Sequence, residues 1–204
     1  MTLRTLHACS AAFIALFALI HIGNHLAGLA GPETHIAYME QARHLYRVPL
    51  VEGLLLACVA FQLLSGLRLA LRGWRTRRGI VPWLQAGSGL YLAFFLTVHV
   101  AAVLAGRGLL HLDTNLYYAA AGLHVAPIQL FFAPYYFLAL PALCLHLACA
   151  LSWRLQGLAR RRVLALLPAF GAIASLLILL SMTGALHPIE IPANYLATYA
   201  SAPR

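Results

Sequence analysis

The sequence predicts an all-α membrane protein with five transmembrane helices, organised as one transmembrane domain over residues 1–204. Hydrophobic residues make up 62% of the chain and charged residues only 9%, whereas charged residues account for about a quarter of a typical soluble domain. The mean hydropathy is +0.82, so membrane lipid is the expected solvent of its surface. The apolar residues also gather into five stretches of about 20 residues, the length that a helix needs to cross the hydrocarbon core.

Each stretch has recognisable ends. The first follows Arg4, exceeds the apolar core of a secretory signal peptide and contains two histidines, so we expect a retained helix. The second begins after Pro49, where a missing N–H costs little, and ends at the basic residues 72–78. The third ends at Gly106, and residues 160–162 separate the fourth from the fifth. We therefore expect helices over residues 8–29, 50–71, 83–105, 134–153 and 163–186.

The arginines are divided unequally between the two ends of these helices. All five acidic residues fall on the side that has few arginines. Because cytoplasmic loops are enriched in arginine, we expect the N-terminus inside, the C-terminus outside, and a multi-pass protein of the bacterial inner (cytoplasmic) membrane. The arginines expected inside are Arg4, Arg68, Arg72, Arg75, Arg77, Arg78, Arg154, Arg160, Arg161 and Arg162, and those expected outside are Arg43, Arg47, Arg107 and Arg204.

The same distribution explains the formal charge of +9 without a nucleic-acid partner. The basic residues lie beside long apolar stretches, and no basic stretch has the interleaved aromatic residues of a nucleic-acid surface. We therefore expect no binding of nucleic acid.

An internal repeat relates the first four helices. Residues 8–71 and 83–153 read as two copies of one helix pair, and residues 163–186 add a fifth helix outside a four-helix bundle. The alternative is chance similarity, because alanine and leucine are so frequent in this chain. The residues that recur at a constant offset are Phe17, His21 and Gly28 in the first copy and Phe95, His99 and Gly106 in the second, and the following helices align Gln62 with His146.

His21 and His99 are the principal site candidates. Polar side chains at membrane depth are costly unless they face the bundle interior, so each one is a functional candidate. Both imidazoles are expected roughly 10 Å inside the outer boundary, where two facing histidines suit the iron of a haem b. His25, one turn further out, is a candidate propionate partner or replacement ligand. The alternative for each histidine is a hydrogen bond between helices.

A second polar layer is expected toward the inner half of the bundle. It contains His146 and Gln62, and the glutamine argues against a second bis-histidine haem. A five-coordinate haem, a quinone or a hydrogen-bonded network with Gln62 stay open. Ser65 and Gly66, one turn after Gln62, are expected to accept a ring edge or a propionate.

The connection after the first helix carries further donors. Arg43, His44, Tyr46 and Arg47 are candidates to bind a quinone carbonyl or a haem propionate, although an interfacial anchor is the favoured interpretation. Surface roles are expected for the histidines of the outer connections and ends, which are His35, His44, His111, His124 and His187.

The segment from Gln62 through Ser65 and Gly66 to Arg68, together with histidines on several helices, resembles the membrane-anchor cytochrome b superfamily of succinate dehydrogenases and fumarate reductases. The segment from Asn24 to Glu52 is similar to a small duplicated membrane family of fungal mitochondria. The resemblance implies haem b in a four-helix bundle, quinone chemistry, and soluble flavin and iron–sulfur partner subunits. It supports His21, His99 and His146 as ligand positions and departs from the pattern at Gln62.

The leading functional hypothesis is therefore a membrane-embedded b-type cytochrome subunit that relays electrons, to or from quinone, within a larger redox complex. It would be the membrane subunit of an oxidoreductase rather than an enzyme alone. The alternative is a haem-free structural or assembly subunit of a membrane complex. A transporter is disfavoured, because no acidic residue lies at membrane depth.

Overall fold

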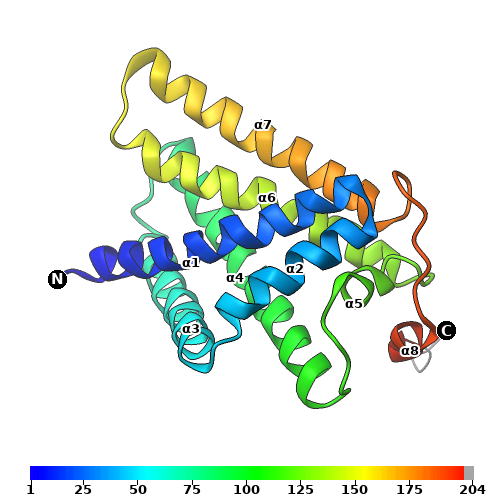
Figure 1. Cartoon of the computed structure of the whole chain (residues 1–204). Helices are drawn as coiled ribbons and strands as arrows, with labels where there is room; N and C mark the ends of the chain where they lie inside the picture. Colours follow the sequence, from blue (N-terminus) through cyan, green and yellow to red (C-terminus); the bar gives the residue numbers. More distant parts are fainter. Residues whose placement is uncertain (200–204) are drawn as a thin grey trace.

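The structure is a computed structural model that describes residues 1–199, and this part of the chain consists of helices joined by short connections (Figure 1). Five helices are long and apolar enough to cross a membrane, which confirms the predicted number. They are α1 (Leu3–Ala27, extended by the 3₁₀ turn Gly28–Ala30), α3 (Pro49–Arg72), α4 (Ile80–Gly108), α6 (Gln129–Ser152) and α7 (Gly157–Met182). The shorter helices are α2 (Pro32–Tyr46), α5 (Leu116–Ala121), α8 (Ala193–Leu196) and a 3₁₀ turn at Ala197–Tyr199.

The helix ends differ most from the prediction where polar residues continue a helix. The Thr2 hydroxyl accepts a hydrogen bond from the Thr5 N–H, so α1 begins at Leu3 instead of residue 8. The predicted fifth helix, 163–186, is displaced: α7 begins at Gly157 and ends at Met182. Arginine is a good helix former and keeps its charged head in water, so the three arginines lie inside the first turns of α7.

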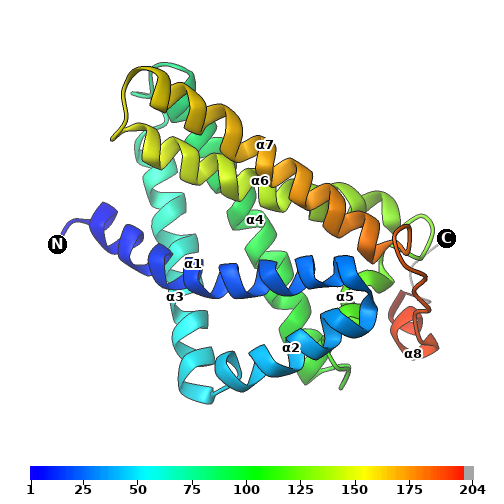
Figure 2. The same ribbon diagram turned by 45° about the horizontal axis from the view of Figure 1, so that its top comes forward.

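Each spanning helix packs against the next one along the chain, and the last helix contacts the first (Figures 1 and 2). α1 packs on α3, α3 on α4, α4 on α6 and α6 on α7, while the C-terminal end of α7 contacts the end of α1 and the 3₁₀ turn that follows it. α1 and α4 are not close backbone neighbours. Their side chains meet at His21 and His99. The internal repeat stays a prediction.

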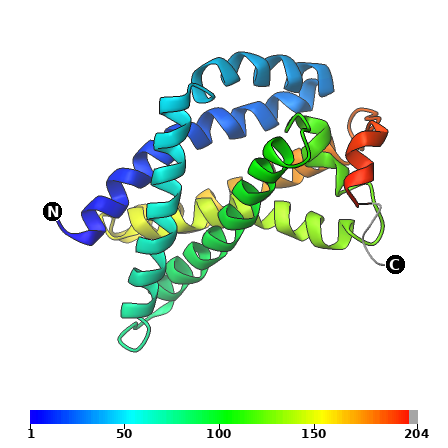
Figure 3. The same cartoon turned by 90° about the horizontal axis from the view of Figure 1, so that it is seen from below.

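One end of the molecule carries the N-terminus and the α3–α4 and α6–α7 connections (Figures 1 and 3). Trp74 and Trp83 meet edge to face there with ring centres 5.0 Å apart, and Trp153 Nε1 donates to Gln85 Oε1 at 3.0 Å. Tryptophan prefers the membrane–water boundary, so these rings mark one interface. Which end faces the cytoplasm stays a prediction, and Arg204 lies outside the described residues.

The connection between the first two spanning helices forms α2, which runs back along the C-terminal half of α1 (Figure 2). Gly23 permits the close approach, because a Cβ atom there would lie 3.2 Å from the Tyr38 hydroxyl oxygen. Further along, the rings of Phe17 and Tyr46 meet edge to face at 5.4 Å. α2 therefore covers one side of the interior that α1 borders.

The buried apolar core lies mainly at α5, α6 and α7. One cluster surrounds Leu116 and Met182, and the other joins Leu140 and Cys144 of α6 to Ala174 of α7. α1 adds only partly buried side chains to the second cluster. The buried apolar clusters therefore do not lie between α1, α3 and α4, where the candidate histidines are found.

Candidate functional site

The imidazoles of His21 on α1 and His99 on α4 meet across the interior. Their ring centres are 5.8 Å apart and their planes are inclined by 68°. Because the backbones of α1 and α4 are not in close contact, the two rings bridge the space between the helices. The structure therefore brings together the two residues that the sequence pairs.

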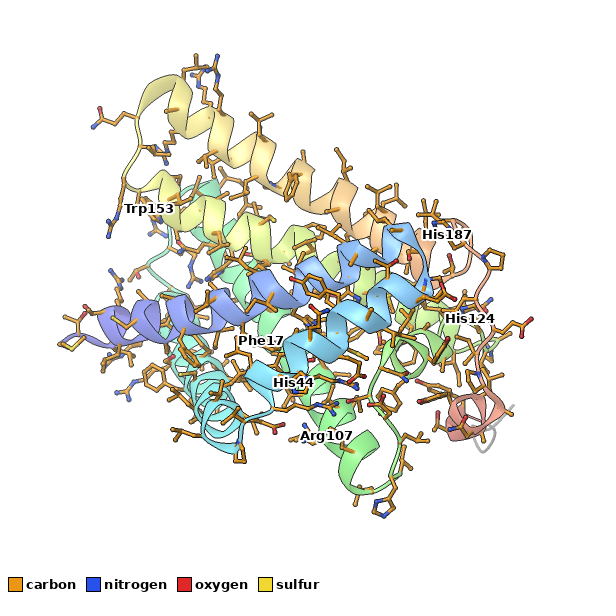
Figure 4. All side chains as sticks on the ribbon, in the orientation of Figure 1. Phe17, His44, Arg107, His124, Trp153 and His187 are labelled. Carbon is orange, nitrogen blue, oxygen red and sulfur yellow. The ribbon has the colours of Figure 1, made fainter. Side chains whose placement is uncertain are left out.

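Each imidazole is backed by a phenylalanine one turn earlier on its own helix. Phe17, labelled in Figure 4, stacks on His21 with ring centres 5.5 Å apart and planes 15° apart. Phe95 stacks on His99 at 5.2 Å and the same angle. The same stacking contact with a phenylalanine therefore restricts the rotation of both imidazole rings.

Neither imidazole has a hydrogen-bond partner among the described residues, 1–199. A polar group at membrane depth normally finds a partner, because an unpaired donor or acceptor is costly where water is absent. This observation disfavours the interpretation of His21 and His99 as hydrogen-bonded contacts between helices. It leaves ring nitrogens of both side chains free for another partner.

The distance between the two rings can be compared with the distance that a shared metal ligand requires. Two opposed imidazoles that bind one metal at about 2 Å from each nitrogen hold their ring centres roughly 6 Å apart, close to the distance seen here. Within the part of the chain that the structure describes, no group of three or more His, Cys, Asp or Glu side chains is arranged to hold a metal ion. A porphyrin supplies four donors itself and needs only two axial ligands from the protein.

His35 of α2 corrects the prediction that this histidine has a surface role. It is only 2% exposed, and its ring centre lies 5.1 Å from that of His25, which in turn lies 4.8 Å from that of His21. His35, Met39 and Arg43 follow one another at a spacing of four residues and form the buried face of α2. That helical spacing is the sequence signal that could have identified His35.

A small polar network links α2 to α1 beside the histidine pair. The Asn24 amide donates to His35 Nε2 at 3.3 Å, and His25 Nδ1 lies 3.4 Å from the same nitrogen. Asn24 Oδ1 and His35 Nδ1 are buried with no partner among the described residues. Burial, reinforced by the nearby Arg43 charge, lowers the pKa of His35 to about 4, so its ring is neutral near pH 7.

The candidate quinone or propionate donors separate into buried and exposed groups. Arg43 is 7% exposed and donates to Asp113 and to Glu40 Oε1, the latter at 2.6 Å. Arg47 Nη2 donates to Thr114 Oγ1 at 3.3 Å. Tyr46 lies beside these arginines, and burial raises its pKa.

His44 is exposed on α2 and does not join the histidine cluster (Figure 4). At the same end, Arg107 of α4 pairs with Glu52 of α3. The arginine-rich end of α2 therefore lies in a network of ion pairs.

Two further histidines connect loops to helix ends. Each imidazole forms a hydrogen bond of 2.9 Å with a backbone carbonyl: His124 with Met182 O, and His187 with Leu29 O.

The inner polar layer differs from the expected pairing of Gln62 with His146. Gln62 Nε2 donates to His7 O at 2.5 Å and to Ser10 Oγ at 2.7 Å, both on α1. His146 instead donates from Nδ1 to Gln85 O of α4 at 3.0 Å. Ser65 Oγ lies 2.7 Å from His7 Nδ1, so a histidine near the N-terminus enters this layer unexpectedly.

Comparison of the chain with family models, with curated proteins and with solved structures found no match. The functional interpretation therefore depends on the histidine geometry and on the sequence motifs alone.

Proposed function

We propose that this chain is a membrane-embedded b-type cytochrome subunit in which His21 and His99 would hold the iron of haem b. One observation carries the proposal: two imidazoles from separate spanning helices meet edge to face with ring centres 5.8 Å apart, and neither has a hydrogen-bond partner among the described residues. Bound in this way, haem b supplies a reversible one-electron carrier inside the bilayer.

The surrounding residues would fix the ligands and shield the site. Phe17 and Phe95 stack on the two imidazoles and hold their orientation. α2 covers the outer side, where the neutral ring of His35 adds no charge beside the iron. Arg43 and Arg47 lie at the C-terminal end of α2. As the sequence analysis proposes, they are candidate donors to an anionic propionate or a quinone carbonyl.

The wider setting follows from the same hypothesis. The chain would exchange electrons with quinone and with partner subunits of a larger redox complex. Its many exposed leucine side chains suit lipid or neighbouring helices. We place it in the bacterial inner membrane with its N-terminus inside, in keeping with the arginine distribution.

A visible spectrum of the purified full-length chain, produced with sufficient haem supply, tests the proposal. We expect a Soret band and sharp reduced α bands in the wild type. His21→Ala and His99→Ala each should remove the low-spin signal that belongs to this pair, whereas His111→Ala, an exposed histidine in the connection after α4, should leave the spectrum unchanged.

A colourless wild-type protein with full helical circular dichroism would refute the cytochrome proposal and favour the haem-free scaffold. A His25→Ala variant completes the design, because His25 lies one turn from His21. If His25→Ala rather than His21→Ala removes the signal, the ligand assignment on α1 is wrong.

A further inference from the structure

An open groove runs along α7 at the end of the molecule that carries the N-terminus. It has a volume of about 430 Å³ and begins at the α6–α7 connection. The residues that line it include Leu155, Ala159, Arg162, Leu166 and Phe170. From Ala159 onward they recur at intervals of three or four residues, so they form one continuous face of the helix. Arg162 is the one charged residue of this lining, and it lies in the half nearer the connection.

The connection beside the groove is strongly basic. It carries Arg154 and the arginines at 160–162, and none of these forms an ion pair within residues 1–199. The ion pairs of the described chain belong instead to Arg43, Arg47 and Arg107. The described residues therefore provide no counter-charge at the basic half of the groove.

The first turn of α7 adds backbone donors to this positive charge. The side chain of Gln156 does not cap the helix, and no acidic residue lies in the first turn. Ala159 of this turn lines the groove, so backbone N–H groups and the positive end of the helix dipole lie beside it. Together with Arg162, they provide the donors that an anionic phosphate requires.

Tryptophan marks the depth of this end in the bilayer. Trp153, labelled in Figure 4, is exposed just before the connection, and the Arg160 guanidinium carbon lies 5.9 Å from its ring centre. Because tryptophan prefers the membrane–water boundary, the basic half of the groove lies at the level of the lipid headgroups. Phe170 lies about 12 Å further along the axis of α7 than Arg162, at the level of the acyl chains.

We propose that this groove binds an anionic phospholipid, with its phosphate at Arg162 and the first turn of α7 and one acyl chain along Leu166 and Phe170. Such a lipid matches both halves of the groove, because its headgroup supplies the missing negative charge and its chain covers the apolar face. A zwitterionic phospholipid carries its own ammonium group beside the phosphate and compensates the arginines less well. The site uses no histidine, so it does not depend on the proposed haem.

Native mass spectrometry of the delipidated full-length chain in detergent tests this proposal. The protein is titrated with palmitoyl-oleoyl phosphatidylglycerol and with phosphatidylethanolamine that has the same acyl chains. We expect the wild type to bind phosphatidylglycerol more tightly. Arg162→Gln should weaken phosphatidylglycerol binding about fivefold and bring the two affinities close together. Arg161→Gln is the matched control, because it removes one charge beside the groove from a side chain that does not line it.

Ala159→Phe tests the apolar half and keeps every charge. The added ring would fill part of the groove, so both lipids should lose their adducts while the helical circular dichroism stays unchanged. Equal wild-type affinity for the two lipids, equal losses in Arg162→Gln and Arg161→Gln, or an adduct retained in Ala159→Phe would each overturn the proposal. A wild-type dimer that Ala159→Phe dissociates, with no lipid adduct in either protein, would also overturn it and assign the groove to a second copy of the chain.

Discussion

Arg43 of α2 forms a bidentate pair with Asp113, a residue 70 positions later that follows α4. Arg43 Nη2 lies 2.6 Å from Asp113 Oδ1, and Nη1 lies 3.2 Å from Oδ2. The pair ties the cover formed by α2 to the connection beyond α4. It also compensates a guanidinium whose side chain is only 8% exposed.

Asp113→Asn should destabilise the protein because the buried guanidinium keeps only Glu40 as a charged partner at close range. Asp113 is partly exposed, so we expect a loss of about 1–2 kcal/mol in the free energy of unfolding, below the range for fully buried pairs. Glu40→Gln, whose carboxylate is 55% exposed, should cost less than about 1 kcal/mol. Denaturant unfolding in detergent measures both, and equal losses would contradict this ranking.

His35 should make stability depend on pH. Its pKa in the folded protein is about 4 against an ordinary value of 6.5, so the unfolded chain binds a proton before the folded one does. Stability is then fully present above pH 6.5 and falls by roughly 1 kcal/mol per pH unit down to pH 4. The slope should be shallower in His35→Gln than in the wild type. Parallel curves for the two proteins would show that His35 does not contribute.

Gly171→Ala should disturb the contact between α6 and α7. A Cβ atom at this position would lie 2.8 Å from Cys144 Sγ and 2.9 Å from Leu140 O, and a backbone oxygen cannot move aside cheaply. We expect a loss of about 1–3 kcal/mol. Gly87→Ala in α4 is the matched control, because no atom lies within 4 Å of its added Cβ, and it should be neutral or slightly stabilising.

The topology is testable with two cysteine variants in a background without the four native cysteines. Glu33→Cys lies near the start of α2 and Arg75→Cys in the α3–α4 connection, at opposite ends of the molecule. With the N-terminus inside, a membrane-impermeant maleimide should label Glu33→Cys in intact spheroplasts and label Arg75→Cys only after lysis. The reverse pattern would invert the orientation.

The sequence predicted what depends on long apolar stretches and missed what depends on how connections fold back. Five spanning helices followed directly from hydropathy, and His21 and His99 from their matching flanks. His35 was assigned to the surface because a polar connection usually lies there, whereas α2 returns along α1 and buries it.

His7 is another residue whose contacts the sequence did not reveal. It precedes the predicted start of the first helix at residue 8, but the Thr2 cap extends α1 and turns this ring toward Ser65. The pairing of Gln62 was likewise undetermined by sequence, since helix depth does not say which neighbour a side chain faces. Gln62 bonds α1 rather than His146.

His7 and His21 lie on the same helix, about 21 Å apart along its axis. If His21 and His99 hold an iron, an electron that reaches it from the end of the molecule near His7 would cross a large part of the bilayer's electric field. Displacing one charge across the whole membrane at 100 mV corresponds to about 2.3 kcal/mol, and a partial crossing takes a proportionate share. The energised state of the membrane would then bias how readily that iron is reduced from this end.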